Sequence, residues 1–140
     1  MSWFKNRMVA AGEIATAKLT VTPVLPQLTA AAESSNAIAV SVQLVDPDGN
    51  SVARSVRLLC QVRKSTGIVA TSSEFRLSET GAGAEVSTTA NPVLVVTTSA
   101  SGTATINVLD QSGAYTDNAY LEVIPLNTFG MPAQITLDFN

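Results

Sequence analysis

The chain has 140 residues, of which 46% are hydrophobic, 5% aromatic and 14% charged, with a formal net charge of −3. This length fits one domain of about 100–200 residues, which can bury a core without disulfide or metal staples. One cysteine and no histidine exclude an internal disulfide, the usual zinc sites and every Ser-His-Asp or Cys-His catalytic arrangement. We therefore expect a binding or structural protein, not an enzyme, with no cofactor and no metal.

The charge balance argues against nucleic acid and membranes as partners. Eight basic against eleven acidic side chains leave no basic excess that would attract phosphates or anionic lipids. The apolar run at residues 8–11 ends at Gly12 and Glu13, so it is too short for a secretory signal. No apolar stretch reaches the ~18–20 residues of a membrane-spanning helix. The sequence thus predicts a protein made in a cytoplasm.

The first 18 residues differ in charge from the rest of the chain. They carry three basic side chains against one acidic one, whereas residues 19–140 carry five basic against ten acidic side chains. We interpret residues 1–18 as an N-terminal arm and residues 19–140 as the domain. Alanines and Glu13 favour a helix over residues 9–17, but Gly12 costs up to about 1 kcal/mol there. The arm is therefore expected to be extended or partly helical.

From residue 19 onward, apolar and polar residues alternate with period two, and turn-forming residues interrupt the alternation. This pattern predicts many short strands joined by turns. A first strand is expected from residue 19 to near Pro26. Residues 37–45 and residues 55–63 alternate cleanly, and the second of these strands places Cys60 among buried apolar side chains.

The two alternating strands are separated by Asp-Pro-Asp-Gly-Asn at residues 46–50. The proline presets one backbone angle and the glycine accepts a positive φ, which predicts a tight turn. The alternating oxygen-bearing side chains resemble the start of a calcium loop. However, Ser51 and Arg57 stand where such a loop needs glycine and a carboxylate. We therefore predict a plain turn.

The second half of the domain is expected to supply the remaining strands. Residues 68–71 and 74–77 are predicted strands, and residues 78–84 a loop. Later strands are expected over residues 93–98, over residues 103–109, around Leu121 and Val123, and over residues 133–139, with turns at residues 99–102 and 127–130. In the last strand we expect the following side chains to face inward: Ile135, Leu137 and Phe139. About eight strands at this spacing predict a β-sandwich.

Residues 37–52 and residues 97–108 resemble the bacterial immunoglobulin-like domain of invasin-type adhesins and tailed-bacteriophage virion proteins. The first segment joins a clean alternation to the Asp-Pro-Asp-Gly-Asn turn, and the second reads Thr-Thr-Ser-Ala-Ser-Gly-Thr-Ala-Thr-Ile-Asn-Val. The resemblance covers about residues 30–139. The chain departs from the family at Arg54, where a glycine is usual, and in the longer segment 67–91. The resemblance implies an all-β, immunoglobulin-like β-sandwich that carries the short arm.

The resemblance also implies a setting. Adhesins carry such domains in tandem behind a leader, whereas phages also use single copies on the particle, and a single leaderless domain with an arm is similar to capsid decoration proteins. The expected function is thus a non-enzymatic virion structural protein made in the host cytoplasm. Its expected partners are the major capsid protein or another virion protein, and it is expected to form a homo-oligomer on the particle. The alternatives are a neck, tail, baseplate or fibre component, and a cell-surface or carbohydrate-binding module.

The candidate partner-binding residues lie in the arm and combine aromatic, basic and apolar side chains: Trp3, Phe4, Lys5, Arg7 and Met8. This composition is typical of an interface anchor. Burial of both aromatic side chains contributes roughly 3–6 kcal/mol gross, so repeated engagement on a symmetric shell would strengthen a marginal contact. Two alternatives stay open: the arm docks on another protein, or it packs on its own domain.

Other candidates are interpreted as structural. Glu74, Glu79 and Glu85 are a local group of carboxylates, which we interpret as solvated acids and not as a pair for glycoside hydrolysis. Gly-Ala-Gly at residues 81–83 predicts a flexible loop and not a phosphate cradle. Leu59 lies opposite the buried face of its strand, so it is either an exposed apolar contact or part of a covered second face.

Overall fold

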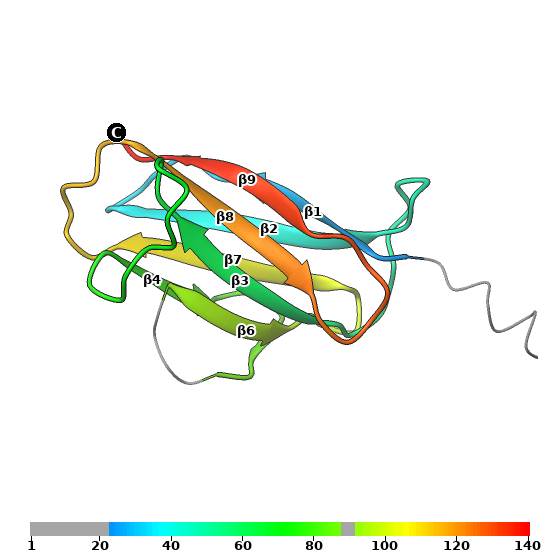
Figure 1. Cartoon of the computed structure of the whole chain (residues 1–140). Helices are drawn as coiled ribbons and strands as arrows, with labels where there is room; N and C mark the ends of the chain where they lie inside the picture. The colour runs from blue at the N-terminus through cyan, green and yellow to red at the C-terminus, as the bar shows by residue number, and fades with distance from the viewer. Residues whose placement is uncertain (1–22, 88–91) are drawn as a thin grey trace, which may run out of the picture.

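The computed structural model describes residues 23–87 and 92–140. These residues form nine strands and no helix (Figure 1), which confirms the all-β prediction. The strands are β1 (Leu25–Ala30), β2 (Ala37–Val45), β3 (Arg57–Arg63), β4 (Phe75–Glu79), β5 (Ala84–Glu85), β6 (Val93–Thr97), β7 (Thr103–Asp110), β8 (Asn118–Pro125) and β9 (Ala133–Asp138).

The strands form two antiparallel sheets that pack face to face as a sandwich (Figure 1). One sheet has the order β1-β2-β7-β4 and the other the order β5-β6-β3-β8-β9. Strands β1, β2, β7 and β4 hold the places of strands A, B, E and D of an immunoglobulin-type domain, and β3, β8 and β9 hold those of C, F and G. The predicted all-β sandwich is therefore confirmed. Between β3 and β7 the chain crosses to the four-stranded sheet with β4 and returns with β5 and β6.

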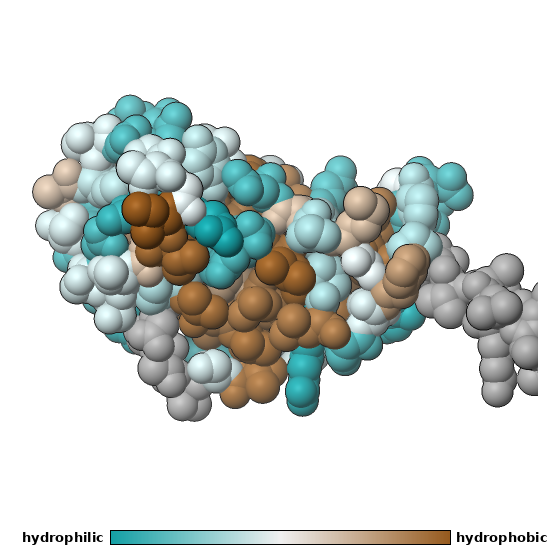
Figure 2. Space-filling model, viewed as in Figure 1, coloured by the Kyte–Doolittle hydropathy of each residue, from teal (hydrophilic) through white to brown (hydrophobic). Residues whose placement is uncertain are grey.

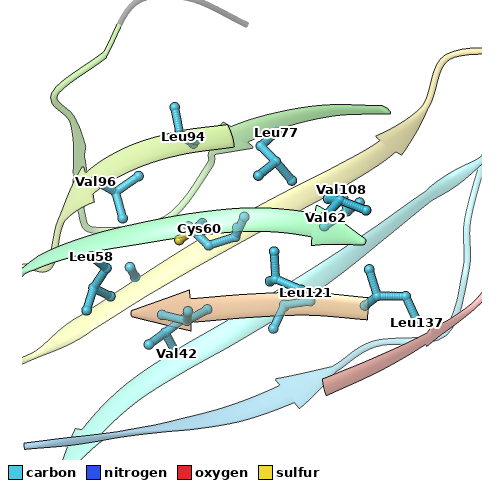
Figure 3. Close-up of a cluster of buried hydrophobic side chains, with 14 of the residues drawn as sticks. Val42, Leu58, Cys60, Val62, Leu77, Leu94, Val96, Val108, Leu121 and Leu137 are labelled. Carbon is cyan, nitrogen blue, oxygen red and sulfur yellow. The ribbon is translucent and has the colours of Figure 1, made fainter. Parts of the chain in front are cut away.

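The core lies between the sheets and follows from the alternation along each strand. In β7 every second residue is buried, and in β3 the buried positions include Leu58 and Cys60, which are 0% exposed. Side chains from both sheets meet in one apolar cluster (Figure 3). Cys60 is thus confirmed as a small buried apolar residue, and its burial raises the pKa of the thiol to about 12.

Three aromatic rings close one end of the core. Phe75, Tyr115 and Phe139 have ring centroids 5.0–5.9 Å apart, in edge or tilted arrangements. Such ring pairs contribute about 0.5–1.5 kcal/mol beyond the area that they bury. The predicted inward direction of Leu137 and Phe139 is thus confirmed, and Ile135 packs against the core while half-buried.

The tight turns behave as the sequence predicts. In the β2–β3 connection, Gly49 has φ +86° and its N–H donates to the Asp46 carbonyl at 2.9 Å. Oδ1 of Asp46 accepts hydrogen bonds from the backbone N–H groups of Asp48 and Asn50, and the bond from Asn50 is the main cause that lowers the pKa of Asp46. Between β6 and β7, Gly102 has φ +75°, and a Cβ there would lie 2.1 Å from the carbonyl oxygen of Val52. Only glycine fits that position.

Two strand predictions are wrong: one strand has different bounds, and another does not form. The first strand does not end near Pro26: β1 begins at Leu25 and continues to Ala30, while residues 19–22 lie outside the described residues. Pro26 is tolerated because β1 is an edge strand. Residues 68–71 form no strand: Val69 makes a single bridge to Arg63, because the chain then leaves for the other sheet.

The segment around β4 also differs from its prediction. The expected strand 74–77 becomes Phe75–Glu79, and the expected loop 78–84 shrinks because β4 takes its first two residues and β5 its last. β4 is longer because it pairs with β7 along its whole length, from Phe75 opposite Asp110 to Glu79 opposite Ile106. Short-range sequence pattern does not report a partner so far along the chain.

Candidate interaction surface

A row of apolar side chains crosses the outer side of the five-stranded sheet. Because Leu58 and Cys60 point into the core, Leu59 points outward. Leu59 lies opposite Val95 on one neighbouring strand and opposite Ile124 on the other. Next to Val95, the N–H of Val86 donates to the Val95 carbonyl at 2.8 Å, which extends the row past β6.

Val93, two residues before Val95, lies beside this row on the same outer side of β6. We call the whole set the apolar patch: Leu59, Val86, Val93, Val95 and Ile124. Figure 2 shows it as a continuous brown area over β6, β3 and β8. Val86 is 46% exposed and Val93 36%, and the other members are half-buried. Leu59 itself is half-buried between Val95 and Ile124, so both predictions left open for it stay predictions.

Charged and polar side chains border the patch along the strand direction. On one side Glu122 accepts hydrogen bonds from Gln61 at 2.9 Å and from Arg63 at 3.3 Å. On the other side stands Arg57, which is exposed. An apolar centre within a polar rim is the usual anatomy of a protein–protein interface.

The apolar surface continues toward the end of the sandwich where the described chain begins. The β8–β9 loop exposes Leu126, Phe129 and Met131, the last two to 68% and 61%. Val24 binds this loop: its N–H donates to the Phe129 carbonyl at 3.0 Å, and its carbonyl accepts from Met131 at 3.2 Å. Between the loop and the patch lies a hollow of about 300 Å³. It is lined by Glu122, Ile124, Pro132, Ala133 and Gln134.

The outer side of the four-stranded sheet has a different chemistry. Over part of β1, β2 and β7 its outward side chains are hydroxyls and amides, and they line a hollow of about 260 Å³. These polar side chains are Gln27, Thr29, Ser41, Gln43, Thr103 and Thr105. We call them the polar face. Ala39 on β2 and Leu109 on β7 also face outward on this side. The two outer sides of one sandwich thus offer very different surfaces to a partner.

The arm residues predicted as the partner-binding site lie outside the described residues. They are Trp3, Phe4, Lys5, Arg7 and Met8. Sequence reasoning singled out Leu59 but missed the rest of the apolar patch. The available signal was the unbroken apolar run at residues 93–96, because a strand with only one buried side should alternate.

The acidic candidates bind parts of the domain together. Oε1 of Glu79 accepts three backbone N–H groups, from Gly81, Gly83 and Thr105, at 2.9–3.1 Å. Glu85 in turn accepts the N–H of Glu79 at 2.8 Å. The interpretation of Glu79 as a solvated acid is therefore wrong, because this carboxylate bonds the loop at residues 81–83 to β7.

Glu74 holds together the segment that leads into β4 through its contacts with Lys64 and Thr71. It pairs with Lys64 at 2.8 Å and accepts hydrogen bonds from the backbone and hydroxyl of Thr71. The bond from Lys64 is the main cause that lowers the pKa of Glu74 to about 2. In residues 23–87 and 92–140, no three Cys, Asp or Glu side chains are grouped so that they could hold a metal ion. The same residues contain no helix that could cross a bilayer.

No protein-family model matches the chain, and no curated protein matches it either. Two solved structures of the β-glucuronidase of Parabacteroides merdae are similar to it, one of them with glycerol in the active site. Their TM-scores are 0.48 and 0.47, at 16% and 15% sequence identity. The similarity covers 85% of this chain but only 13% and 12% of the glucuronidase chains, so this chain spans a small part of their length.

Proposed function

We propose that the chain is a structural protein of a tailed-phage particle and that it acts by binding other proteins, as a decoration protein of the capsid. The apolar patch is the observation that carries this proposal. An apolar area this continuous, placed at the centre of a sheet face and bordered by charges, marks an interaction site on a protein surface. The resemblance of residues 37–52 and 97–108 to virion domains supplies the setting.

The patch and the arm are two separate means of attachment. A decoration protein stabilises a shell because it binds the assembled form, so its binding free energy adds to the stability of that form alone. Two weak contacts on one chain reinforce each other, because the first holds the second at a high effective concentration. In this proposal Trp3 and Phe4 anchor the arm on the major capsid protein, and the patch faces a neighbouring protein on the particle.

The copy number of the chain in purified particles tests the proposal. Quantitative mass spectrometry against the major capsid protein should find hundreds of copies per particle if the chain decorates the shell. A dozen or fewer copies would contradict decoration and favour the neck, tail, baseplate or fibre. Complete absence from the particle would overturn the virion proposal and favour a cell-surface or carbohydrate-binding module.

Removal of residues 1–12 tests the role of the arm. The truncated chain should keep its sandwich, because β1 and the bonds of Val24 lie far along the chain from the deletion. We expect it to remain folded by circular dichroism and to lose binding to particles stripped of this protein. Normal binding by the truncated chain would contradict the proposal that the arm attaches it.

A further inference from the structure

We propose that the apolar patch binds the apolar patch of a second copy of the chain, so that two five-stranded sheets stack face to face. This inference rests on the proposed role of the patch as an interface and names its partner. Three observations support it: the shape of the row, the charges on either side of it, and the size of the sheet face.

The row is self-complementary. Val86, Val95, Leu59 and Ile124 follow one another across the sheet, perpendicular to the strands. A twofold axis along this row places each of the four side chains over the same residue of the other copy, as an isologous contact requires. Sheets that stack in this way lie about 10 Å apart, with strand directions within about 30° of each other. Leucine and valine side chains fill such a gap.

The charges beside the row are complementary under the same axis. Rotation about the row exchanges its two sides, so Arg57 of one copy faces the Gln61 and Glu122 side of the other. The Arg57 side chain makes no hydrogen bond or ion pair with the described residues. The carboxylate of Glu122 already accepts hydrogen bonds from Gln61 and Arg63, and its remaining lone pairs could accept a further one from Arg57. Each pair of copies would form this contact twice. Because both side chains are partly exposed to water, the contact between Arg57 and Glu122 would determine the orientation of the two copies more than their affinity.

The face is large enough for a small interface with a second copy. Neighbouring strands lie about 4.8 Å apart, so β6 and β9 are separated by about 15 Å, and the eight residues of β8 extend about 27 Å. These two spans enclose about 400 Å² of sheet, about half of the ~800 Å² that each partner buries in a standard interface, so the pairing belongs to the small, weaker class of interfaces. The described chain begins at one end of the sandwich (Figure 1), so stacked sheets leave the attachment points of both arms at the rim.

Analytical ultracentrifugation of the full chain tests the proposal, with Leu59→Lys as the disrupting variant. A lysine at the centre of the patch would place two charges against each other across the twofold axis. We expect the wild-type chain to dimerise and Leu59→Lys to raise the dimer dissociation constant about 100-fold, as for the loss of an interface hot spot. Ser41→Lys is the matched control, because it adds the same charge at the centre of the polar face, and its dissociation constant should be unchanged.

Arg57→Glu provides a second variant at an exposed position where folding is not at risk. It should raise the dissociation constant about tenfold, since a like charge then faces Glu122. Circular dichroism checks that each variant is folded. A wild-type chain that stays monomeric up to about 1 mM would overturn the inference, as would folded Leu59→Lys and Arg57→Glu variants that dimerise like the wild type.

These outcomes are separate from those that test the proposed function. If the wild type is monomeric but Leu59→Lys no longer binds particles, the patch contacts a different virion protein. That result overturns pairing between copies and leaves the virion role intact. If the chain dimerises through the patch and is absent from particles, the virion role fails and the pairing stands.

Discussion

Ser41 and Thr105 lie side by side at the centre of one outer face of the sandwich, and Leu59 and Val95 lie side by side at the centre of the other. All four positions are outward members of an alternating strand, and the inward neighbours of each are buried and apolar. Folding therefore requires the same of both sheets, namely that every second residue of a strand is apolar and faces the core. The outward residues are not fixed by this demand and are free to differ between the two faces.

Strand propensity does not explain the difference. Threonine and valine are both β-branched and are both favoured in strands. Hydroxyls and amides keep the polar face hydrated, whereas an apolar area of this kind on a free surface promotes association. The difference between the two faces is the one expected if, as we propose, the polar face meets water and the apolar patch meets protein.

The sharpest test of the comparison uses two adjacent leucines on β3. Leu58 is 0% exposed, and Leu59 is half-buried on the other side of the strand. Leu58→Ala should lower the free energy of unfolding by about 2–5 kcal/mol, because it opens a cavity in the core. Leu59→Ala should lower it by about 1 kcal/mol or less, because the removed atoms were partly hydrated. Urea unfolding of the dilute chain measures both values. Equal losses would mean that the outer face is covered within the monomer.

A second test compares two threonines in different surroundings. Thr98 is 3% exposed, and its hydroxyl donates to the Arg54 carbonyl at 3.0 Å and accepts from the Val56 N–H at 2.9 Å. Thr98→Val should therefore cost about 1–3 kcal/mol, because two buried backbone groups lose their partner. Thr29→Val on the polar face should change the unfolding free energy by no more than about 0.5 kcal/mol. A comparable cost at the two positions would contradict the view that the polar face is only hydrated.

The smallest expected effect is a loss of folding stability in acid, and it arises from Glu74, just before β4 of the four-stranded sheet. The pKa of Glu74 is about 2 in the folded chain against an ordinary value of 4.5. Its interactions therefore stabilise the fold above pH 4.5, and this contribution is lost as the pH falls from 4.5 toward 2. Glu74→Gln should lower the unfolding free energy at pH 7, and the difference from wild type should shrink over that window. Asp138→Asn is the control, because this exposed carboxylate makes no hydrogen bond or ion pair with the described residues. A difference that stays constant with pH would contradict the role of the Lys64 contact.

Most of the fold could be predicted because the core depends on local alternation. The prediction of a strand over residues 37–45 agrees with β2 at both ends, and the turn at residues 46–50 follows from its proline and glycine. The region between β3 and β6 could not be predicted in detail. There the chain changes sheets, and β4 is set by its pairing with β7, some thirty residues further on. Such pairing leaves no local mark in the sequence.

The candidate surface was harder to predict than the fold. An outward Leu59 is visible from alternation alone, but its neighbours Val95 and Ile124 join it only when β6 and β8 pair with β3. The role of Glu79 has the same origin, because the loop that it binds and the Thr105 N–H come together only in three dimensions. Patches and networks that several strands share require the register of the sheet, and the sequence pattern does not contain that register.

The attachment of Val24 has a mechanical consequence. This residue bonds to Phe129 and Met131 at the end of the five-stranded sheet, and the next residue opens β1 in the four-stranded sheet. Gly130 lies so close to Val24 that a Cβ there would stand 2.6 Å from the Val24 carbonyl oxygen. Tension applied through the N-terminal segment and along β1 would therefore load the hydrogen bonds of both sheets together, and in shear. The sandwich would resist such a pull as one body, and its first strand would not peel away alone.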